Sequence, residues 1–275
     1  MDITKRYETK QEIRKLDTKI SGFISQFCIG TLLNQHGIRK QRGISPLVLF
    51  STIFMLPFKG VNFSRGIVKN TELNFGKDAA YALLRNPRHN WRNFLFSLVV
   101  GVIRFFCTLT DEKREKVFIF DDSTYDRNRS KAVELLAWIH DHNAHRSMKG
   151  FKMLTLGWSD GINFLPVDFV LSSSTKAAKR VQGITKKLDK RTCVYKRRQE
   201  AMEKITQHLE TMVKRALRRG IKADYILMDS WLRIPRKVAT YSMRSLPPIP
   251  RESCHLSERS DAGILHLLCG LFCCQ

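Results

Sequence analysis

Hydrophobic residues recur at helical spacing through the first 112 residues of the chain. Apolar side chains between Ile20 and Leu32 fall on one helix face, and two longer apolar stretches follow, separated by Gly, Pro and basic residues. This pattern predicts helices near residues 20–32, 45–56, 64–69, 77–84 and 91–109. We therefore expect residues 1–112 to form an all-helical module.

From residue 117 the pattern changes to short apolar runs of strand length. It predicts strands at residues 117–120, 151–158, 163–171 and 223–228, with a short helix at 127–139 and a long helix at 194–219. Asp160-Gly161 supplies a tight turn between the second and third strands, because glycine tolerates a positive φ. Gly220 provides the stop signal of the long helix.

Two of these strands run directly into carboxylates. Asp121 and Asp122 follow the first apolar run, and Asp229 follows the last one. Charged groups at the rim of a sheet need compensation, and a divalent cation with oxygen ligands is a common solution. The alternative is that Asp121 or Asp122 caps the next segment.

The order of the elements predicts the fold class. A strand with an acid, a hairpin of two strands, a crossover helix and a strand with a second acid form the opening of an RNase H-like fold. We expect an α/β protein: an N-terminal all-helical module followed by an incomplete RNase H-like mixed sheet with flanking helices. The predicted domains are residues 1–112 (DNA-binding), 113–232 (partial catalytic domain) and 233–275 (an atypical tail).

The charge of the chain predicts a polyanionic partner. There are 48 lysines and arginines against 25 acids, a formal net charge of +23. Nucleic acid is the first candidate and an anionic membrane surface the second, although the basic stretch lacks an aromatic-rich amphipathic face. The helical module, with basic residues at its turns, suits groove binding or, alternatively, dimerisation. No signal peptide is visible and the cysteines show no framework spacing, which favours the cytosol.

The densest basic run lies between the hairpin and the last strand. Its residues are candidates for DNA phosphate contacts, and a solvated helix face is the alternative. The candidates are Lys186, Lys187, Lys190, Arg191, Lys196, Arg197 and Arg198.

Three segments together resemble a known family. They are Phe120-Asp121-Asp122-Ser123-Thr124, the run from Lys149-Gly150-Phe151 to Ser159-Asp160-Gly161, and Leu227-Met228-Asp229-Ser230-Trp231. Over residues 15–232 the chain is similar to DDE transposases of bacterial insertion sequences, within the insertion-sequence-four-like group.

The resemblance implies DNA transposition by cleavage and strand transfer on Mg²⁺, or Mn²⁺ in its place, held by three carboxylates. It implies Asp122 as the first carboxylate and metal ligand, with Asp121 in reserve, and Asp229 as the second. The implied partner is double-stranded DNA at the terminal inverted repeats. The implied location is the bacterial cytoplasm, at the nucleoid. A homodimer is a further possibility that the resemblance leaves open.

The chain departs from the family after about residue 232. The expected helix with Tyr, Arg, Glu and Lys at fixed spacing is missing, and Glu252, Glu258 and Asp261 are the only acids there. We expect an out-of-frame tail and a truncated transposase that does not catalyse transposition alone. The alternatives are a catalytically inactive DNA-binding regulator of transposition and, third, another RNase H-like nuclease such as a resolvase.

This expectation can be tested on the gene. We predict that one of the other reading frames downstream of the Trp231 codon encodes further strands and the missing glutamate helix. Sequencing and translating that region in all three frames checks it. If no frame restores the helix, the tail belongs to the protein, and the prediction of function is reduced to DNA binding.

Overall fold

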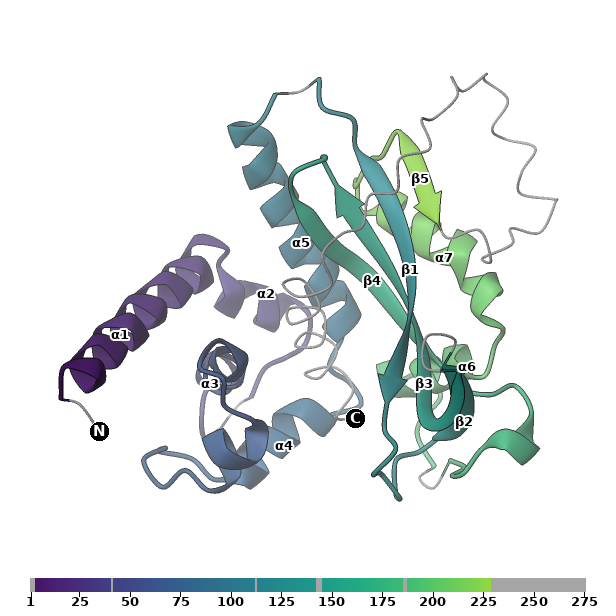
Figure 1. Cartoon of the computed structure of the whole chain (residues 1–275), viewed down its shortest axis with the longest axis horizontal. Coiled ribbons are helices and arrows are strands. Elements are labelled where there is room, and N and C mark those ends of the chain that lie inside the picture. Colours follow the sequence, from purple (N-terminus) through teal and green to yellow (C-terminus); the bar gives the residue numbers. More distant parts are fainter. Residues whose placement is uncertain (1–2, 41, 112, 142–144, 185–186, 229–275) are drawn as a thin grey trace. The chain divides into compact units, whose positions relative to one another are not determined.

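The computed structural model describes residues 3–40, 42–111, 113–141, 145–184 and 187–228 (Figure 1). The chain divides into two compact units. The first contains residues 3–113 and 187–198, and the second contains residues 114–184 and 199–228 as far as they are described. The predicted tail and Asp229 lie outside the described residues.

The first unit is helical, as predicted. Its helices are α1 (Ile3–Gln26), α2 (Ile29–Gln35), α3 (Pro46–Phe58), α4 (Lys77–Arg85) and α5 (Trp91–Leu109), with one π-helical turn at Ser64–Val68. The expected helix at residues 20–32 is two helices, because Cys28 takes a left-handed φ of 48° between α1 and α2. Pro57 lies inside α3 rather than ending it.

The core of this unit forms around α5. Trp91, Phe94, Leu95 and Val99 are among its buried residues, and Phe50 of α3 stacks against Trp91 and meets Phe94 edge to face. By length and composition α5 is the one candidate membrane span among the described residues. Part of this apolar helix is buried in the core of the unit, at Trp91, Phe94–Phe96, Leu98, Val99 and Val102.

The second unit is a five-stranded mixed sheet with helices beside it (Figure 1). Its strands are β1 (Val117–Asp126), β2 (Ala137–Asp141), β3 (Arg146–Ser159), β4 (Phe164–Ser172) and β5 (Tyr225–Met228). β3 pairs antiparallel with β1, β2 and β4, and β5 pairs parallel with β1. The order β4-β3-β1-β5 confirms the expected opening of an RNase H-like sheet.

Three local predictions about this unit are wrong. β1 continues for six residues past Phe120, because β3 pairs with it as far as Asp126. The segment expected as a short helix contains strand β2, whose side chains alternate between buried and exposed. The long helix is two, α6 (Cys193–Ala201) and α7 (Ile205–Arg218), separated by a turn in which the Lys204 N–H donates to Gln207 Oε1.

β5 also differs from the fully buried strand that its composition predicts. Tyr225, Ile226 and Leu227 are 41–49% exposed, since β5 is the last strand in the described sheet order. Its start is nevertheless firmly attached to β1. Lys116 and Asp224 exchange two hydrogen bonds, from the Lys116 N–H to Asp224 Oδ2 (2.8 Å) and from the Asp224 N–H to the Lys116 carbonyl (2.6 Å).

A buried charged cluster holds α7 against the same sheet. Arg215 of α7 pairs with Asp168 of β4 at 2.7 Å and with Glu200 of α6 at 2.9 Å. Asp168 is 1% exposed, so its charge depends on this compensation. Burial lowers the pKa of the neighbouring His208, against the opposing charges of Glu200 and Glu203.

The β3–β4 turn confirms its prediction and generates a test. Gly161 has a φ of +88°, and Asp160 Oδ1 accepts hydrogen bonds from the Ile162 and Asn163 N–H groups. Burial alone would raise the pKa of Asp160. The hydrogen bonds from Asn163 and Ile162, with the Arg114 charge, outweigh it and hold the pKa below 3.8.

We predict that Asp160→Ala lowers the free energy of unfolding by about 1 kcal/mol, because two partly buried turn N–H groups lose their acceptor. Asp160→Asn keeps the acceptor and should cost less. The stability that the ionised Asp160 adds is fully present above about pH 5 and is lost as the pH falls through its lowered pKa. Urea unfolding between neutral and acid pH measures both, and equal stability of Asp160→Ala and wild type would contradict this role of the turn.

Candidate metal and nucleic-acid sites

Asp121 and Asp122 lie within β1 and project to opposite faces of the sheet. Side chains alternate along a strand, so Asp122 shares the face of Phe118 and Phe120, which are both buried. The Asp122 side chain is 4% exposed, whereas Asp121 is exposed. The interpretation that these acids cap the next segment does not hold, because both are interior strand residues.

Lys152 compensates the Asp122 carboxylate. Asp122 is opposite Leu154 in the β1–β3 ladder and Lys152 is opposite Thr124, so the two charged residues are diagonal neighbours on one face. Lys152 Nζ lies 3.5 Å from Asp122 Oδ2. A carboxylate this buried needs a nearby positive charge, and β3 provides it.

The parallel β1–β5 ladder aligns the described end of β5 with the residue before the β1 acids. Phe118 is paired with Ile226 and Phe120 with Met228, the last described residue of β5. Asp229 follows Met228 directly in the sequence. The position of its carboxylate lies outside the described residues, so its role as the second ligand stays a prediction.

The chemistry of these side chains suits a hard cation. Carboxylate oxygens are the ligands that Mg²⁺ and Mn²⁺ take, and a buried carboxylate with a cationic neighbour marks a place where positive charge is already required. Within the described ranges no group of three or more His, Cys, Asp or Glu side chains is close enough to hold a metal. Any further ligands of a metal at Asp122 would lie outside the described residues.

The predicted DNA-binding residues belong to the first unit rather than to the sheet that holds Asp122. Lys187, Lys190 and Arg191 are exposed in the loop before α6, and Arg191 pairs with Asp189 at 3.3 Å. Lys196, Arg197 and Arg198 lie on α6, and Lys186 lies outside the described residues. The described part of the basic run is therefore divided between the loop before α6 and the helix α6 itself.

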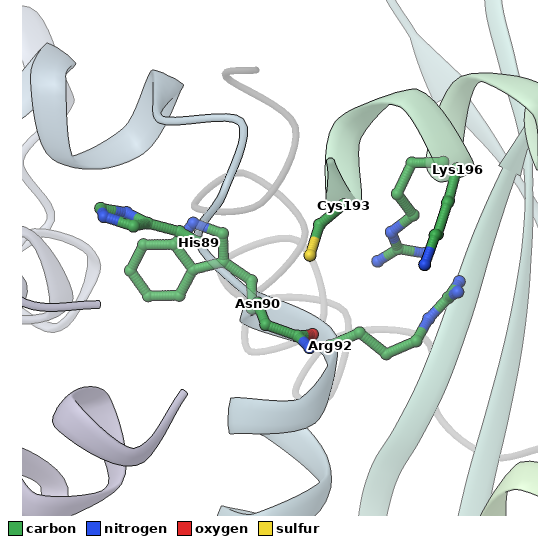
Figure 2. Close-up of a pocket in the computed structure, with 7 residues that line it drawn as sticks. His89, Asn90, Arg92, Cys193 and Lys196 are labelled. Carbon is green, nitrogen blue, oxygen red and sulfur yellow. The ribbon is translucent and has the colours of Figure 1, made fainter. Parts of the chain in front are cut away.

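In the first unit, part of this basic run lies beside the turn before α5, and the two segments line a small cavity. The sequence had not selected that turn as part of a site. The cavity has a volume of about 150 Å³ and is lined by residues 89–92 and by Cys193, Lys196 and Arg197 (Figure 2). The basic turn before α5 was visible in the sequence. Its proximity to α6, roughly a hundred residues later, had no sequence signal.

Backbone contacts fix the geometry of this cavity. The Val194 N–H donates to the Pro87 carbonyl at 3.4 Å, which joins the start of α6 to the turn before α5. Asn90 caps α5 by accepting from the Asn93 N–H at 3.1 Å. His89 is buried, and its Nδ1–H donates to the Leu83 carbonyl at 2.9 Å. Burial lowers the pKa of His89, so the ring is neutral at pH 7.

We predict that Lys152→Met lowers the free energy of unfolding by about 1–2 kcal/mol, because the buried Asp122 loses a compensating charge. Millimolar Mg²⁺ should raise the melting temperature of this variant more than that of wild type, since the ion can replace the missing charge. Lys152→Arg is the matched control and should behave like wild type. A thermal unfolding series with and without Mg²⁺ measures both effects, and identical Mg²⁺ responses in all three proteins would contradict this account.

Comparison with known proteins agrees with this geometry. The sequence profile of a family described as DDE superfamily endonuclease matches residues 67–235, more than half of the chain and the whole described sheet. The search of curated proteins finds no match. The chain therefore belongs to the DDE superfamily endonucleases.

Proposed function

We propose that this chain is a DNA transposase of a bacterial insertion sequence, in which Asp122 and Asp229 are the first two catalytic carboxylates. The parallel pairing of β5 with β1 is the observation that supports this most directly. Met228, the last described residue of β5, is the register partner of Phe120, and Asp121 and Asp122 follow Phe120 in β1. Asp229 follows Met228 in the sequence, and we infer from this register that it serves the same site as Asp122.

Each residue then has a defined part in phosphoryl transfer. Asp122 and Asp229 would hold divalent cations, which would supply the charge that activates the attacking oxygen and stabilises the leaving oxygen. Lys152 compensates the Asp122 carboxylate on the sheet face in the absence of a cation. Asp121, exposed on the opposite face, is the reserve candidate and the natural control.

The partner that fits the charge is double-stranded DNA. The net charge of +23 and the exposed basic loop before α6 supply the phosphate contacts that dominate DNA affinity. We propose that the helical unit recognises terminal inverted repeats, that two copies of the chain can pair on them, and that the protein acts in the bacterial cytoplasm at the nucleoid.

We further propose that the chain by itself does not complete the reaction. Two carboxylates hold a second cation poorly, and in-line displacement needs charge on both the attacking and the leaving oxygen. Glu252, Glu258 and Asp261, the only acids after Asp229, lie outside the described residues. This favours, as a second function, a regulator that occupies inverted repeats without cutting them.

We predict that the purified chain binds duplex DNA ending in its inverted repeat with strong salt dependence and does not nick it in Mg²⁺. A gel-shift series in increasing salt and a nicking assay on supercoiled plasmid measure the two properties. Asp122→Asn, Asp229→Asn and the control Asp121→Asn should bind DNA with equal affinity, because phosphate contacts dominate binding.

Three outcomes separate the alternatives. Mg²⁺-dependent nicking that is lost in Asp229→Asn but not in Asp121→Asn would establish an active transposase site. It would overturn the proposal that the chain by itself cannot complete the reaction. Cleavage of branched DNA without preference for inverted repeats would instead indicate a resolvase-like nuclease. A chain that binds no DNA at any salt concentration would contradict the proposed function altogether.

A further inference from the structure

The cavity between the turn before α5 and the start of α6 has the chemistry of an anion site. Arg92, Lys196 and Arg197 line it, and none of the described residues in its lining is acidic. Asp189 of the basic loop pairs with Arg191 and is not among these lining residues. A cavity whose described lining has three cationic residues and no carboxylate favours a ligand that carries negative charge.

Helical spacing explains why the cations converge. Cys193, Lys196 and Arg197 are related by three and four positions, so they share one face of the first turns of α6. Arg92 is the second residue of α5, which begins at Trp91. Figure 2 shows the Arg92 and Lys196 side chains extending into the same region from the two helices. The cavity therefore lies at two helix N-termini, whose N–H groups add positive potential.

The architecture is fixed before any ligand binds. The Val194 N–H to Pro87 carbonyl bond joins the start of α6 to the turn before α5, and the Asn90 cap fixes the first turn of α5 itself. His89 lines one side of the cavity. Its ring is neutral and donates a hydrogen bond to the Leu83 carbonyl, so it adds no fourth positive charge. A site whose shape is already formed spends little binding energy on ordering its side chains.

We propose that this cavity binds a backbone phosphate of duplex DNA, with Arg92, Lys196 and Arg197 as the contacting residues. The inference rests on the proposed DNA-binding function and assigns one phosphate position within it. The exposed Lys187, Lys190 and Arg191 precede the cavity in the chain and offer contacts to neighbouring phosphates. Bound here, the phosphate would fix the register of the DNA on the helical unit without reading its sequence.

Cys193 provides a direct probe, because its thiol lines the cavity and is partly exposed. The full chain is treated with N-ethylmaleimide, alone and with a 30-base-pair duplex, and modification of each cysteine is followed by peptide mass spectrometry. We expect DNA to slow alkylation of Cys193 by about fivefold or more and to leave Cys28, an exposed thiol of the same unit, unchanged.

A charge-matched pair of variants tests the contacting residues. Arg92→Gln/Lys196→Gln should weaken binding of the duplex by about tenfold, the effect expected for lost charge-assisted hydrogen bonds. It should also reduce the slope of log affinity against log salt by about 1–2. Lys214→Gln/Arg218→Gln removes the same charge from exposed positions of α7 and should change affinity far less.

The outcomes separate this inference from the proposed function. If DNA binds but Cys193 reacts at its original rate, or if the two double variants weaken binding equally, the cavity assignment is overturned while the DNA-binding function stands. If the wild-type chain binds no DNA while inorganic phosphate still protects Cys193 from alkylation, the cavity is a site for a free anion. That result overturns both the DNA phosphate assignment and the proposed function.

Discussion

The sheet of the second unit depends on β1 being paired along both of its edges. A strand in this position must satisfy its N–H and C=O groups on each side: β3 pairs along the whole of β1, and β5 pairs with Val117–Phe120 on the other edge. The antiparallel β3 extends β1 through two acids to Asp126, and the parallel β5 ends beside Phe120. Because both ladders share one strand, the described end of β5 lies beside the residue that precedes Asp121 and Asp122 in β1.

Charge compensation is the second constraint. Asp122 and Asp168 are both nearly buried on the same face of the sheet, and each has a cation from another element within ion-pair distance. They differ in how many groups that cation joins. Arg215 is shared with Glu200 and joins three elements, so this pair is structural. Lys152 pairs with Asp122 across one strand ladder, and in the proposed function a divalent ion would take over its compensating charge.

The basic residues are organised differently from the acids. The dense run belongs by its contacts to the helical unit, and the acids belong to the sheet. A transposase must hold DNA and cut it with different groups, since phosphate contacts provide affinity and metal-bound carboxylates provide the chemistry. In the proposed phosphate site, the three cations that line the cavity at α5 and α6 would bind one phosphate, and the exposed loop before α6 would contact others.

The sequence alone determined the fold class, the α5 helix from Trp91 to Leu109, the Asp160-Gly161 turn and the family, because each depends on local periodicity or a contiguous motif. It did not determine the length of β1, whose polar residues 121–126 stay extended only because β3 pairs with them. Nor did it show the break between α6 and α7, since the apolar stripe continues across it, or strand β2, which is held by β3. The Asp122–Lys152 pair and the cavity beside Cys193 join residues 30 and about a hundred positions apart. Register and helix packing set those distances, and neither leaves a local pattern in the sequence.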